Sequence, residues 1–461
     1  MSPTLTPMEH SALQIVRRLT DKGFQALYAG GYVRDRLLGR GTHGDIDIAT
    51  SATPEQVSRV FPHVVGVGEH FGVMIVVWDG TPFEVATFRA DVGSTDGRHP
   101  DSVSFTDART DAQRRDFTIN GMFFDPISEE VLDYVGGRED LSAGIIRAIG
   151  EPLLRFGEDY LRLLRAVRFS ARFGFPIEPA TWSALVAARD GIAQVSQERV
   201  FQELDKMLVG AHPDAAIRQL HESGLLALVL PEVEAMVGVE QPAQFHPEGD
   251  VFEHTIKALA LIEEVDRVIA WSVLLHDIGK PRTQQMSDRI RFNNHQRVGA
   301  NMSARVLTRL HAPNALIDAV YACVDNHMNF INVQQMKLST LKKFLARPTF
   351  HAELVVHKAD CQSSHGDISN YDYLQAKARE MPVDQIKPAP LVGGKDLIAL
   401  GLTPGPRFGQ ILSAAYDLQL EEKLTTHEEA VEWVRENHLV GEESRSENRE
   451  AENPTDPTMP V

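Results

Sequence analysis

Cysteine is nearly absent from this sequence of 461 residues, because Cys323 and Cys361 are the only two. Two cysteines exclude a scaffold held by several disulfides and a zinc site built from four thiolates. Basic residues are also in short supply: 46 Lys and Arg stand against 64 Asp and Glu, a formal net charge of −18. A nucleic-acid ligand would therefore have to meet a local basic surface.

Long hydrophobic runs are missing as well. The longest apolar stretch, residues 268–275, ends at His276 and Asp277, and residues 1–20 lack the charged start and apolar core of a leader peptide. We expect a cytoplasmic protein that does not contact a membrane. Hydrophobic residues make up 43% and charged residues 24%, as in ordinary globular proteins, and the length predicts about three domains.

Two kinds of local pattern divide the chain and predict an α+β fold. Residues 25–147 alternate short β-branched or aromatic runs with Gly, Pro and Asp, which predicts a mixed sheet with helices and the only sheet of the protein. From residue 151 onward, helical periodicity replaces this pattern. The predicted strands are 26–29, 45–49, 73–78 and 83–89, and the clearest predicted helices are 160–172, 199–208, 215–230 and 301–310.

Breaks in pattern predict five segments. Pro- and Gly-containing joints at 242–249 and 387–394 separate regions of different composition. Residues 441–461 hold many acids and almost no bulky apolar residue, so we expect a disordered tail. The predicted segments are a head at 1–150, a helical neck and body at 151–236, an all-α histidine-rich domain at 237–386, a helical C-terminal segment at 387–440, and the tail.

Two aspartates in the head are the first chemical signal. Alternation along a strand places Asp45 and Asp47 on one face, and such paired carboxylates suit Mg²⁺. Upstream, the glycine pair Gly30 and Gly31 lets backbone N–H groups approach a phosphate, and Arg34 offers a guanidinium to its oxygens. Each pattern alone is usually a turn or a solvated strand edge, but their conjunction within twenty residues favours a metal and phosphate site. Glu84 is either a third carboxylate or a solvated residue.

An arginine stripe marks the start of the neck. Arg162, Arg165, Arg168 and Arg172 recur every three or four residues and so share one helix face. By itself such a stripe is typical of a solvated face, and an Asp159–Arg162 salt bridge is an equally simple interpretation.

Together the head and neck motifs resemble the class II tRNA nucleotidyltransferase and bacterial poly(A) polymerase family. The resemblance rests on Gly-Gly-x-Val-Arg-Asp, Asp-Ile-Asp-Ile-Ala-Thr, Arg-Arg-Asp-Phe-Thr-Ile-Asn and Glu-Asp-x-x-Arg, and it extends to about residue 435. It implies Mg²⁺ on Asp45 and Asp47 as the catalytic pair, with Glu84 as the candidate third member. It implies nucleotide binding by Gly31, Arg34, Arg114, Arg115, Asp116, Asp159, Arg162, Arg165 and Arg168.

Some details of that implied site stay open. Either Arg114 or Arg115 matches the family arginine that contacts the triphosphate. Tyr32 and Tyr160 stand where smaller residues are expected and would narrow the pocket. The motif that contains Arg199, over residues 195–208, is also similar to a family motif, and we expect it to pack the neck helix.

A carboxylate beside a guanidinium explains how side chains alone could select bases. Cytosine and adenine each present an amine donor next to a ring-nitrogen acceptor, whereas guanine and uracil present a carbonyl next to an N–H. Asp159 accepting from the amine and Arg162 donating to the ring nitrogen would therefore fit C and A and reject G and U.

Histidines in the following domain resemble the HD phosphohydrolase signature. His254, His276, Asp277 and Asp360 have its order and spacing, and His295 and His327 are additional candidates for a second ion. Any single one of the 18 histidines is more simply a surface or core residue. As a set they imply a divalent transition metal and hydrolysis of 2′,3′-cyclic or 3′-phosphate RNA ends.

The leading hypothesis is template-independent addition of C and A from CTP and ATP to the 3′ end of tRNA. The alternative in the same class is an enzyme that adds only adenine, or a poly(A) polymerase. The stretch 89–107 is full length, which argues only against an enzyme that adds CC alone. Alternatives of other classes are an HD phosphohydrolase whose head grips RNA and a non-catalytic RNA-binding protein. No oligomeric state is predicted.

Overall fold

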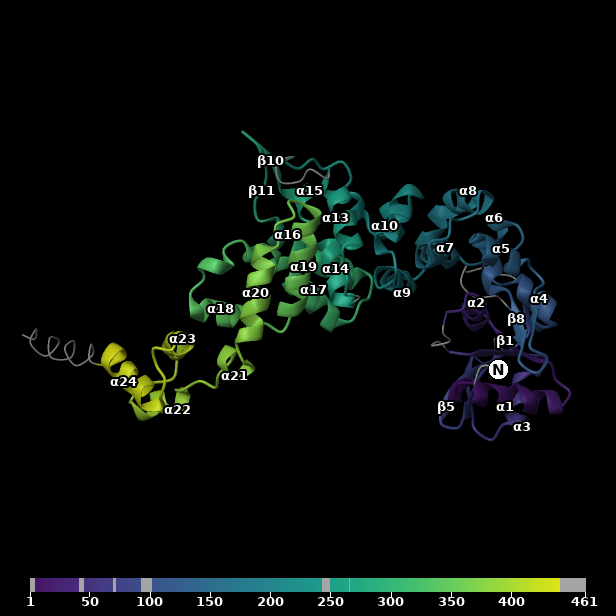
Figure 1. The fold of residues 1–461 in the computed structure, drawn as a ribbon, viewed down its shortest axis with the longest axis horizontal. Coiled ribbons are helices and arrows are strands. Elements are labelled where there is room, and N and C mark those ends of the chain that lie inside the picture. Colours follow the sequence, from purple (N-terminus) through teal and green to yellow (C-terminus); the bar gives the residue numbers. More distant parts are fainter. Residues whose placement is uncertain are drawn as a thin grey trace, which may run out of the picture. The chain divides into compact units, whose positions relative to one another are not determined.

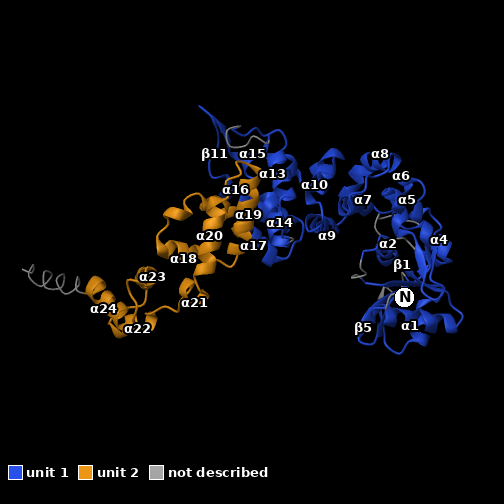
Figure 2. Cartoon of the chain, viewed as in Figure 1, with its two compact units in different colours: residues 1–321 blue, residues 322–461 orange. Residues whose placement is uncertain are grey.

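The computed structural model describes residues 5–40, 45–68, 72–92, 102–242, 249–264 and 266–439. The chain forms two compact units, residues 1–321 and 322–461, coloured blue and orange in Figure 2. The boundary falls inside helix α17 (Asn314–Asn326). The predicted tail and residues 96–100 of the 89–107 stretch lie outside the described residues.

Unit 1 contains a seven-stranded mixed sheet in the order β3-β4-β5-β2-β1-β8-β9, and Figure 1 labels its strands β1, β5 and β8. Strand β2 pairs antiparallel with β1 and parallel with β5. The four predicted strands correspond to β1, β2, β4 and β5. The predicted start at residue 45 is wrong, because β2 begins at Asp47 and Asp45 lies before the strand that was expected to carry both aspartates. The strands of this sheet are β1 (Ala26–Ala29), β2 (Asp47–Thr50), β3 (Val64–Gly68), β4 (Val73–Trp78), β5 (Thr81–Thr87), β8 (Phe123–Asp125) and β9 (Glu130–Leu132).

Alternation of side chains explains why these segments form the sheet. In β5, Phe83 and Val85 are buried while Glu84 between them is exposed. Helix α1 covers the sheet with a fully buried row that includes Ile15 and Leu19, and a Thr6–Glu9 capping box fixes its start. The other elements of this region are α1 (Pro7–Asp21), α2 (Gly31–Leu37), α3 (Pro54–Val60), the β6 (Arg89–Val92) and β7 (Ser102–Phe105) ribbon, α4 (Ala108–Gln113) and α5 (Gly137–Ala143).

Helices follow the sheet, as the periodicity predicts. The predicted helix 160–172 is α7, and 199–208 is α9. The single helix predicted at 215–230 is in fact two, because Gly224 takes φ +77° and interrupts it. The helices are α6 (Pro152–Glu158), α7 (Leu161–Phe173), α8 (Pro179–Ala188), α9 (Gln197–Leu208), α10 (Pro213–Glu222), α11 (Leu225–Val229) and α12 (Pro231–Glu234).

The histidine-rich part of unit 1 differs from expectation in one detail. The hairpin of β10 (Gln284–Met286) and β11 (Ile290–Phe292) shows that 25–147 does not hold the only sheet. These strands are three residues long and largely exposed, so they carry no apolar alternation that a sequence could reveal. The helices here are α13 (Val251–Ala260), α14 (Arg267–Leu275), α15 (Lys280–Thr283), α16 (His295–Arg309) and the start of α17.

Unit 2 is helical in its described part. Its later helices pack around Leu397, Ile411 and Val434, which are almost fully buried. Beyond α17 the helices are α18 (Leu338–Leu345), α19 (Phe350–Ser363), α20 (Ser369–Glu380), α21 (Val383–Ile386), α22 (Gly394–Ala399), α23 (Pro406–Leu420) and α24 (His427–His438).

The α+β class, with a mixed sheet in the head and helices after it, is confirmed. The division into five segments stays a prediction. None of the helices in the described ranges has both the length and the hydrophobicity needed to span a membrane.

Candidate functional site

Carboxylates from two neighbouring strands meet in unit 1. Asp47 opens β2 and Glu84 lies in β5, and the parallel register that pairs Ile48 with Val85 places the two acids side by side. Burial raises the pKa of Asp47 to about 6, with the charges of Glu84 and Asp45 acting in the same direction and Arg115 opposing them. Asp45 is exposed just before the strand. The three carboxylates therefore form one cluster of negative potential.

A cavity of about 510 Å³ opens beside this cluster. All nine nucleotide-binding candidates line it, together with Asp47 and Glu84, whereas Asp45 is not among the lining residues. The other lining residues are Ala29, Gly30, Ile48, Ala49, Val73, Ala86, Arg89, Asn120, Phe169 and Arg172. Tertiary structure thus gathers residues that lie up to 143 positions apart, from Ala29 to Arg172, around one space.

A glycine turn and a buried arginine form one wall. Gly30 has φ +65° and ψ −130°, a conformation that favours glycine, and it leads directly into α2. Arg34 in that helix is 3% exposed and donates from Nη1 to Asn120 Oδ1 at 2.6 Å and from Nε to Asp35 Oδ1 at 2.8 Å. Asn120 therefore holds this guanidinium, a role that its sequence motif alone did not reveal.

Arg114 and Arg115 share a single anchor. Both donate to the buried carboxylate of Asp111, at 2.9 Å from Arg114 Nε and 3.0 Å from Arg115 Nη2. The Arg115 guanidinium also lies 4.8 Å from the Phe123 ring centroid, and its charge acts on Asp47. The helical spacing of three and four residues from Asp111 could have predicted this anchor.

Asp116 connects the head to α7. Its Oδ2 accepts from Arg165 Nε at 2.8 Å and Nη2 at 2.6 Å, and its Oδ1 accepts from Asn120. Burial acts to raise the pKa of Asp116, but the charge and hydrogen bonds of Arg165 and the Asn120 amide outweigh it and hold the pKa at about 2. Asp116 and Arg165 thus form a charged pair that links the head to the neck helix.

Two side chains of helix α9 form hydrogen bonds to residues that line the cavity. Glu203, 2% exposed, accepts from Arg168 Nε at 2.5 Å, and Arg199 Nη2 donates to Asp159 Oδ2 at 2.8 Å. The segment expected only to pack the neck helix therefore orients side chains of the cavity. The separations of 35 and 40 residues leave no local pattern from which these contacts could be predicted.

The Asp159–Arg162 salt bridge proposed as a simpler interpretation is wrong, because each residue has another partner. Arg162 Nη1 donates to Glu158 Oε2 at 2.5 Å, and its Nη2 donates to the backbone oxygen of Arg114 at 2.9 Å. Asp159 instead pairs with Arg199. Both side chains line the cavity, as a base-reading pair requires.

The two unexpected tyrosines do not narrow this cavity. The Tyr32 hydroxyl donates to Glu9 Oε1 at 2.7 Å beneath α1. The Tyr160 ring lies against Gly191, where an added Cβ would come within 2.1 Å of it. Neither ring is among the lining residues.

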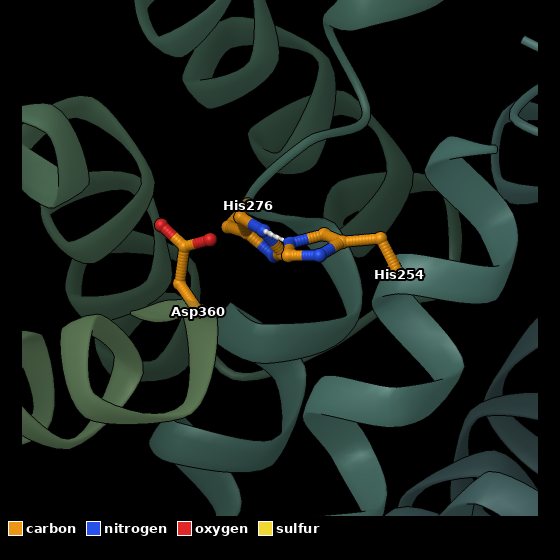
Figure 3. Close-up of side chains that lie close together, drawn as sticks. All are labelled: His254, His276 and Asp360. Atoms are coloured by element: carbon orange, nitrogen blue, oxygen red, sulfur yellow. Dashed lines mark hydrogen bonds between the residues drawn. The ribbon is translucent and has the colours of Figure 1, made fainter. Parts of the chain in front are cut away.

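The histidine-rich part of unit 1 carries four candidate metal ligands. Figure 3 shows the rings of His254 and His276, whose Nε2 atoms are 3.3 Å apart. Asp277 lies within 3.2 Å of His276 Nε2 and 3.4 Å of His295 Nε2, and all four side chains are buried. Burial lowers the pKa of His295, which favours the neutral ring that a metal requires.

Backbone contacts orient these rings. The Nδ1 atoms of His276 and His295 lie 2.8 Å and 2.9 Å from the carbonyl oxygens of Val273 and Phe292. Such a contact fixes Nδ1 as the protonated nitrogen and leaves Nε2 to coordinate a metal, the arrangement found around bound ions. The donor set of imidazole and carboxylate fits a divalent transition metal.

Unit 2 contributes two further candidate groups. His327 is 2% exposed, and its Nδ1 lies 2.7 Å from the carbonyl oxygen of Val324, the same local arrangement. Asp360, labelled in Figure 3, projects from α19. The described residues of both units therefore include side chains that could bind a metal ion.

Comparison with known proteins agrees with the two kinds of site. Residues 26–147 match the family described as "Poly A polymerase head domain", residues 174–237 match "Probable RNA and SrmB- binding site of polymerase A", and residues 251–362 match "HD domain". The chain is 42% identical over 231 residues to a CCA-adding enzyme of Bacillus velezensis and 42% identical over 222 residues to one of Geobacillus thermodenitrificans. These alignments cover 50% and 48% of the chain, and they span 57% and 54% of the relatives' lengths.

Solved structures extend the likeness over the chain. A crystal structure of the Bacillus stearothermophilus CCA-adding enzyme in complex with CTP has a TM-score of 0.74 and 28% identity, and covers 96% of this chain and 100% of its own. A Thermotoga maritima CCA-adding enzyme complexed with tRNA has the same fold, with a TM-score of 0.60, 21% identity and coverage of 94% and 96%. The chain therefore matches, in order, a poly A polymerase head domain, a polymerase RNA-binding region and an HD domain, and it shares its fold with the solved CCA-adding enzymes.

Proposed function

We propose that this protein adds C and A nucleotides from CTP and ATP to the 3′ end of tRNA without a nucleic-acid template. The observation that carries the proposal is the cavity in which adjacent carboxylates, a set of arginines and the Asp159–Arg162 pair surround one space. The similarity to CCA-adding enzymes, one of them bound to CTP, supports this choice over a general RNA-binding role.

The carboxylates have the chemistry for a magnesium site. Asp45 and Asp47, with Glu84 beside them, supply hard oxygen ligands, and burial, together with the charges of Glu84 and Asp45, raises the pKa of Asp47. Bound Mg²⁺ would lower the pKa of the RNA 3′-hydroxyl and stabilise the charge of the leaving pyrophosphate. The protein's own part is to hold the nucleotide in line for that attack.

Arginines that line the same cavity position the triphosphate. Arg34 is fixed by Asn120, and Arg115 is fixed by Asp111 and lies close enough to act on the charge of Asp47. We infer that Arg115, more than Arg114, contacts the phosphates nearest the carboxylates. Arg114 contributes its backbone oxygen to the placement of Arg162.

Base selection falls to Asp159 and Arg162. Arg199 holds one oxygen of Asp159, while Glu158 and two backbone carbonyls, those of Arg114 and Arg155, hold Arg162. Because both side chains are held before a base arrives, G and U would meet a carboxylate and a guanidinium of the wrong polarity. Arg165 and Arg168 support this wall through Asp116 and Glu203.

The test is incorporation of labelled CTP and ATP, singly and together, into tRNA that lacks its CCA end. CCA synthesis predicts that full extension needs both nucleotides, whereas an adenine-only enzyme would extend only tRNA that already ends in CC. Asp47→Asn should reduce incorporation on the order of 10³-fold, because charge stabilisation is the main catalytic contribution in phosphoryl transfer. Asp190→Asn, at an exposed position in the same unit, is the control.

We further propose that the HD domain hydrolyses 2′,3′-cyclic or 3′-phosphate RNA ends. His254, His276, Asp277 and Asp360 would hold a divalent transition metal, with His295 and His327 available to a second ion. The support is the shared orientation of three of these imidazoles, those of His276, His295 and His327, each with Nδ1 against a backbone carbonyl. A bound ion of this kind would supply a hydroxide nucleophile at neutral pH.

The two activities separate by mutation. His276→Ala should abolish release of phosphate from 3′-phosphorylated RNA and leave nucleotide incorporation intact, and Asp47→Asn should do the opposite. If Asp47→Asn left all measurable activity unchanged, the protein would be a phosphohydrolase whose head only grips RNA. We place both activities in the cytoplasm, in agreement with two buried cysteines that form no disulfide.

A further inference from the structure

Three guanidinium groups surround one aromatic ring in unit 1. The Cζ atoms of Arg34, Arg40 and Arg172 lie 4.8, 5.1 and 5.2 Å from the ring centroid of Phe173. Phe173 itself stacks on Phe169, with centroids 6.2 Å apart and planes at 6°. A pair of stacked rings thus gives the guanidinium groups a rigid apolar base.

The positive charge of this cluster is only partly balanced. Among the described residues, Asp35 is the acid that forms ion pairs with this cluster. Its Oδ1 lies 2.8 Å from Arg34 Nε, and its Oδ2 lies 3.3 Å from Arg172 Nη2. Three guanidinium groups against one carboxylate leave a local excess of positive charge, although the chain as a whole carries −18. Partial burial and the charges of Arg34 and Arg40 lower the pKa of Arg172, which is the direction expected where an anion is lacking.

The cluster extends from the cavity to the surface. Arg34 and Arg172 are lining residues of the cavity, and Arg40 is not. Arg34 is buried, whereas the side chain of Arg172 is 44% exposed and Arg40 is also exposed. The unbalanced charge therefore continues past the space in which a nucleotide would bind.

We propose that Arg40 and Arg172 bind phosphate groups of the RNA strand that receives the new nucleotide, a site that rests on the proposed nucleotide addition. Planar guanidinium groups bind phosphate oxygens in pairs, and two exposed arginines of which only Arg172 lines the cavity suit a ligand longer than one nucleotide. The phosphates of the incoming nucleotide are the competing source of the same chemistry. They would be held deeper, at Arg34 and Arg115.

The test compares Arg40→Gln, Arg172→Gln and the double variant with the full-length protein. Equilibrium binding of tRNA lacking its CCA end is measured between about 50 and 300 mM KCl without nucleotide, and KM for CTP is measured separately. Each single change should weaken RNA binding about three- to tenfold, and the double variant should lower the slope of log K against log salt by about 1.5 to 2. KM for CTP should not change.

Arg59→Gln is the matched control, because Arg59 is an arginine of α3 with 72% of its side chain exposed and an ion pair to Glu55. It should leave RNA affinity and the salt slope as they are. Thermal melting of every variant checks that the fold is intact. RNA affinity is measured without nucleotide. A protein that binds RNA but adds no nucleotide would therefore contradict the proposed function and leave the proposed RNA site in place.

Two results would overturn the site. A higher KM for CTP with unchanged RNA affinity would assign the cluster to the nucleotide's own phosphates. If the double variant kept the RNA affinity, the salt slope and the KM for CTP of the wild type, the cluster would bind no phosphate.

Discussion

Asp116 combines deep burial with a charge, and this makes it sensitive to pH. Its pKa of about 2 in the folded protein lies below the usual 3.8, so the ionised group stabilises the fold above about pH 4. That contribution is lost as the pH falls from 4 toward 2. We expect Asp116→Asn to lower the free energy of unfolding by about 2 kcal/mol at pH 7, which follows from a shift of nearly two pKa units.

Urea unfolding of the wild type and Asp116→Asn at a series of pH values checks this expectation. The difference between the two proteins should shrink below pH 4, where the wild-type carboxylate begins to take up a proton. Asp190→Asn, whose side chain is 84% exposed, should give a difference near zero throughout. A difference that stays constant down to pH 2 would mean that the Arg165 pair does not carry the effect.

Among the helices, α9 positions side chains of α7 and of the segment that precedes α7. Arg199 is the one α9 side chain paired with Asp159 among the described ion pairs, and the contact is 2.8 Å long. With Arg199→Gln, Asp159 loses its charged partner and can adopt other rotamers. We expect the preference for CTP over UTP, as a ratio of kcat/KM, to fall about tenfold.

Arg189→Gln is a suitable control for that measurement, because Arg189 is a partly exposed arginine with a weak ion pair to its neighbour Asp190. A purely structural effect would lower kcat/KM for both nucleotides equally. An unchanged CTP to UTP ratio in Arg199→Gln would therefore contradict the positioning role.

The contact between Gly191 and Tyr160 couples a 3-10 segment to the start of α7. A Cβ at Gly191 would lie 2.1 Å from the Tyr160 ring, so Gly191→Ala should destabilise the protein by about 2 kcal/mol. In the background of Tyr160→Ala the same change should cost much less, because the clashing ring is gone. A double-mutant cycle by urea unfolding measures the coupling, and Gly157→Ala, with open space around it, is the control.

The whole molecule carries two candidate metal sites of different chemistry, one of carboxylates and one of imidazoles with a carboxylate. A chelator should remove nucleotide addition and phosphate release together. Mg²⁺ alone should restore nucleotide addition, because Mg²⁺ prefers oxygen ligands, whereas phosphate release should need a transition metal such as Mn²⁺, Co²⁺ or Ni²⁺. Assays of both reactions after dialysis and readdition of single metals check this, and recovery of both by Mg²⁺ alone would contradict two distinct sites.

Local structure and the chemistry of single motifs could be predicted from the amino-acid sequence. Period-two and period-3.6 patterns are set by neighbouring residues, so the strands around Asp47 and Glu84 and the helix with Arg162 were predictable. The short hairpin at 284–292 and the break at Gly224 were not, because one has no apolar alternation and the other depends on a single left-handed residue.

Which charged groups are partners could not be predicted, because it depends on how distant segments pack together. Arg199 with Asp159, Glu203 with Arg168 and Asp116 with Arg165 join residues 35 to 49 positions apart. Pairing over such distances depends on how α7 packs against α9 and the head, and burial then determines whether a charge is costly or stabilising. For this reason the sequence could name the side chains of the cavity, and the fold alone could show which of them are held and which face the ligand.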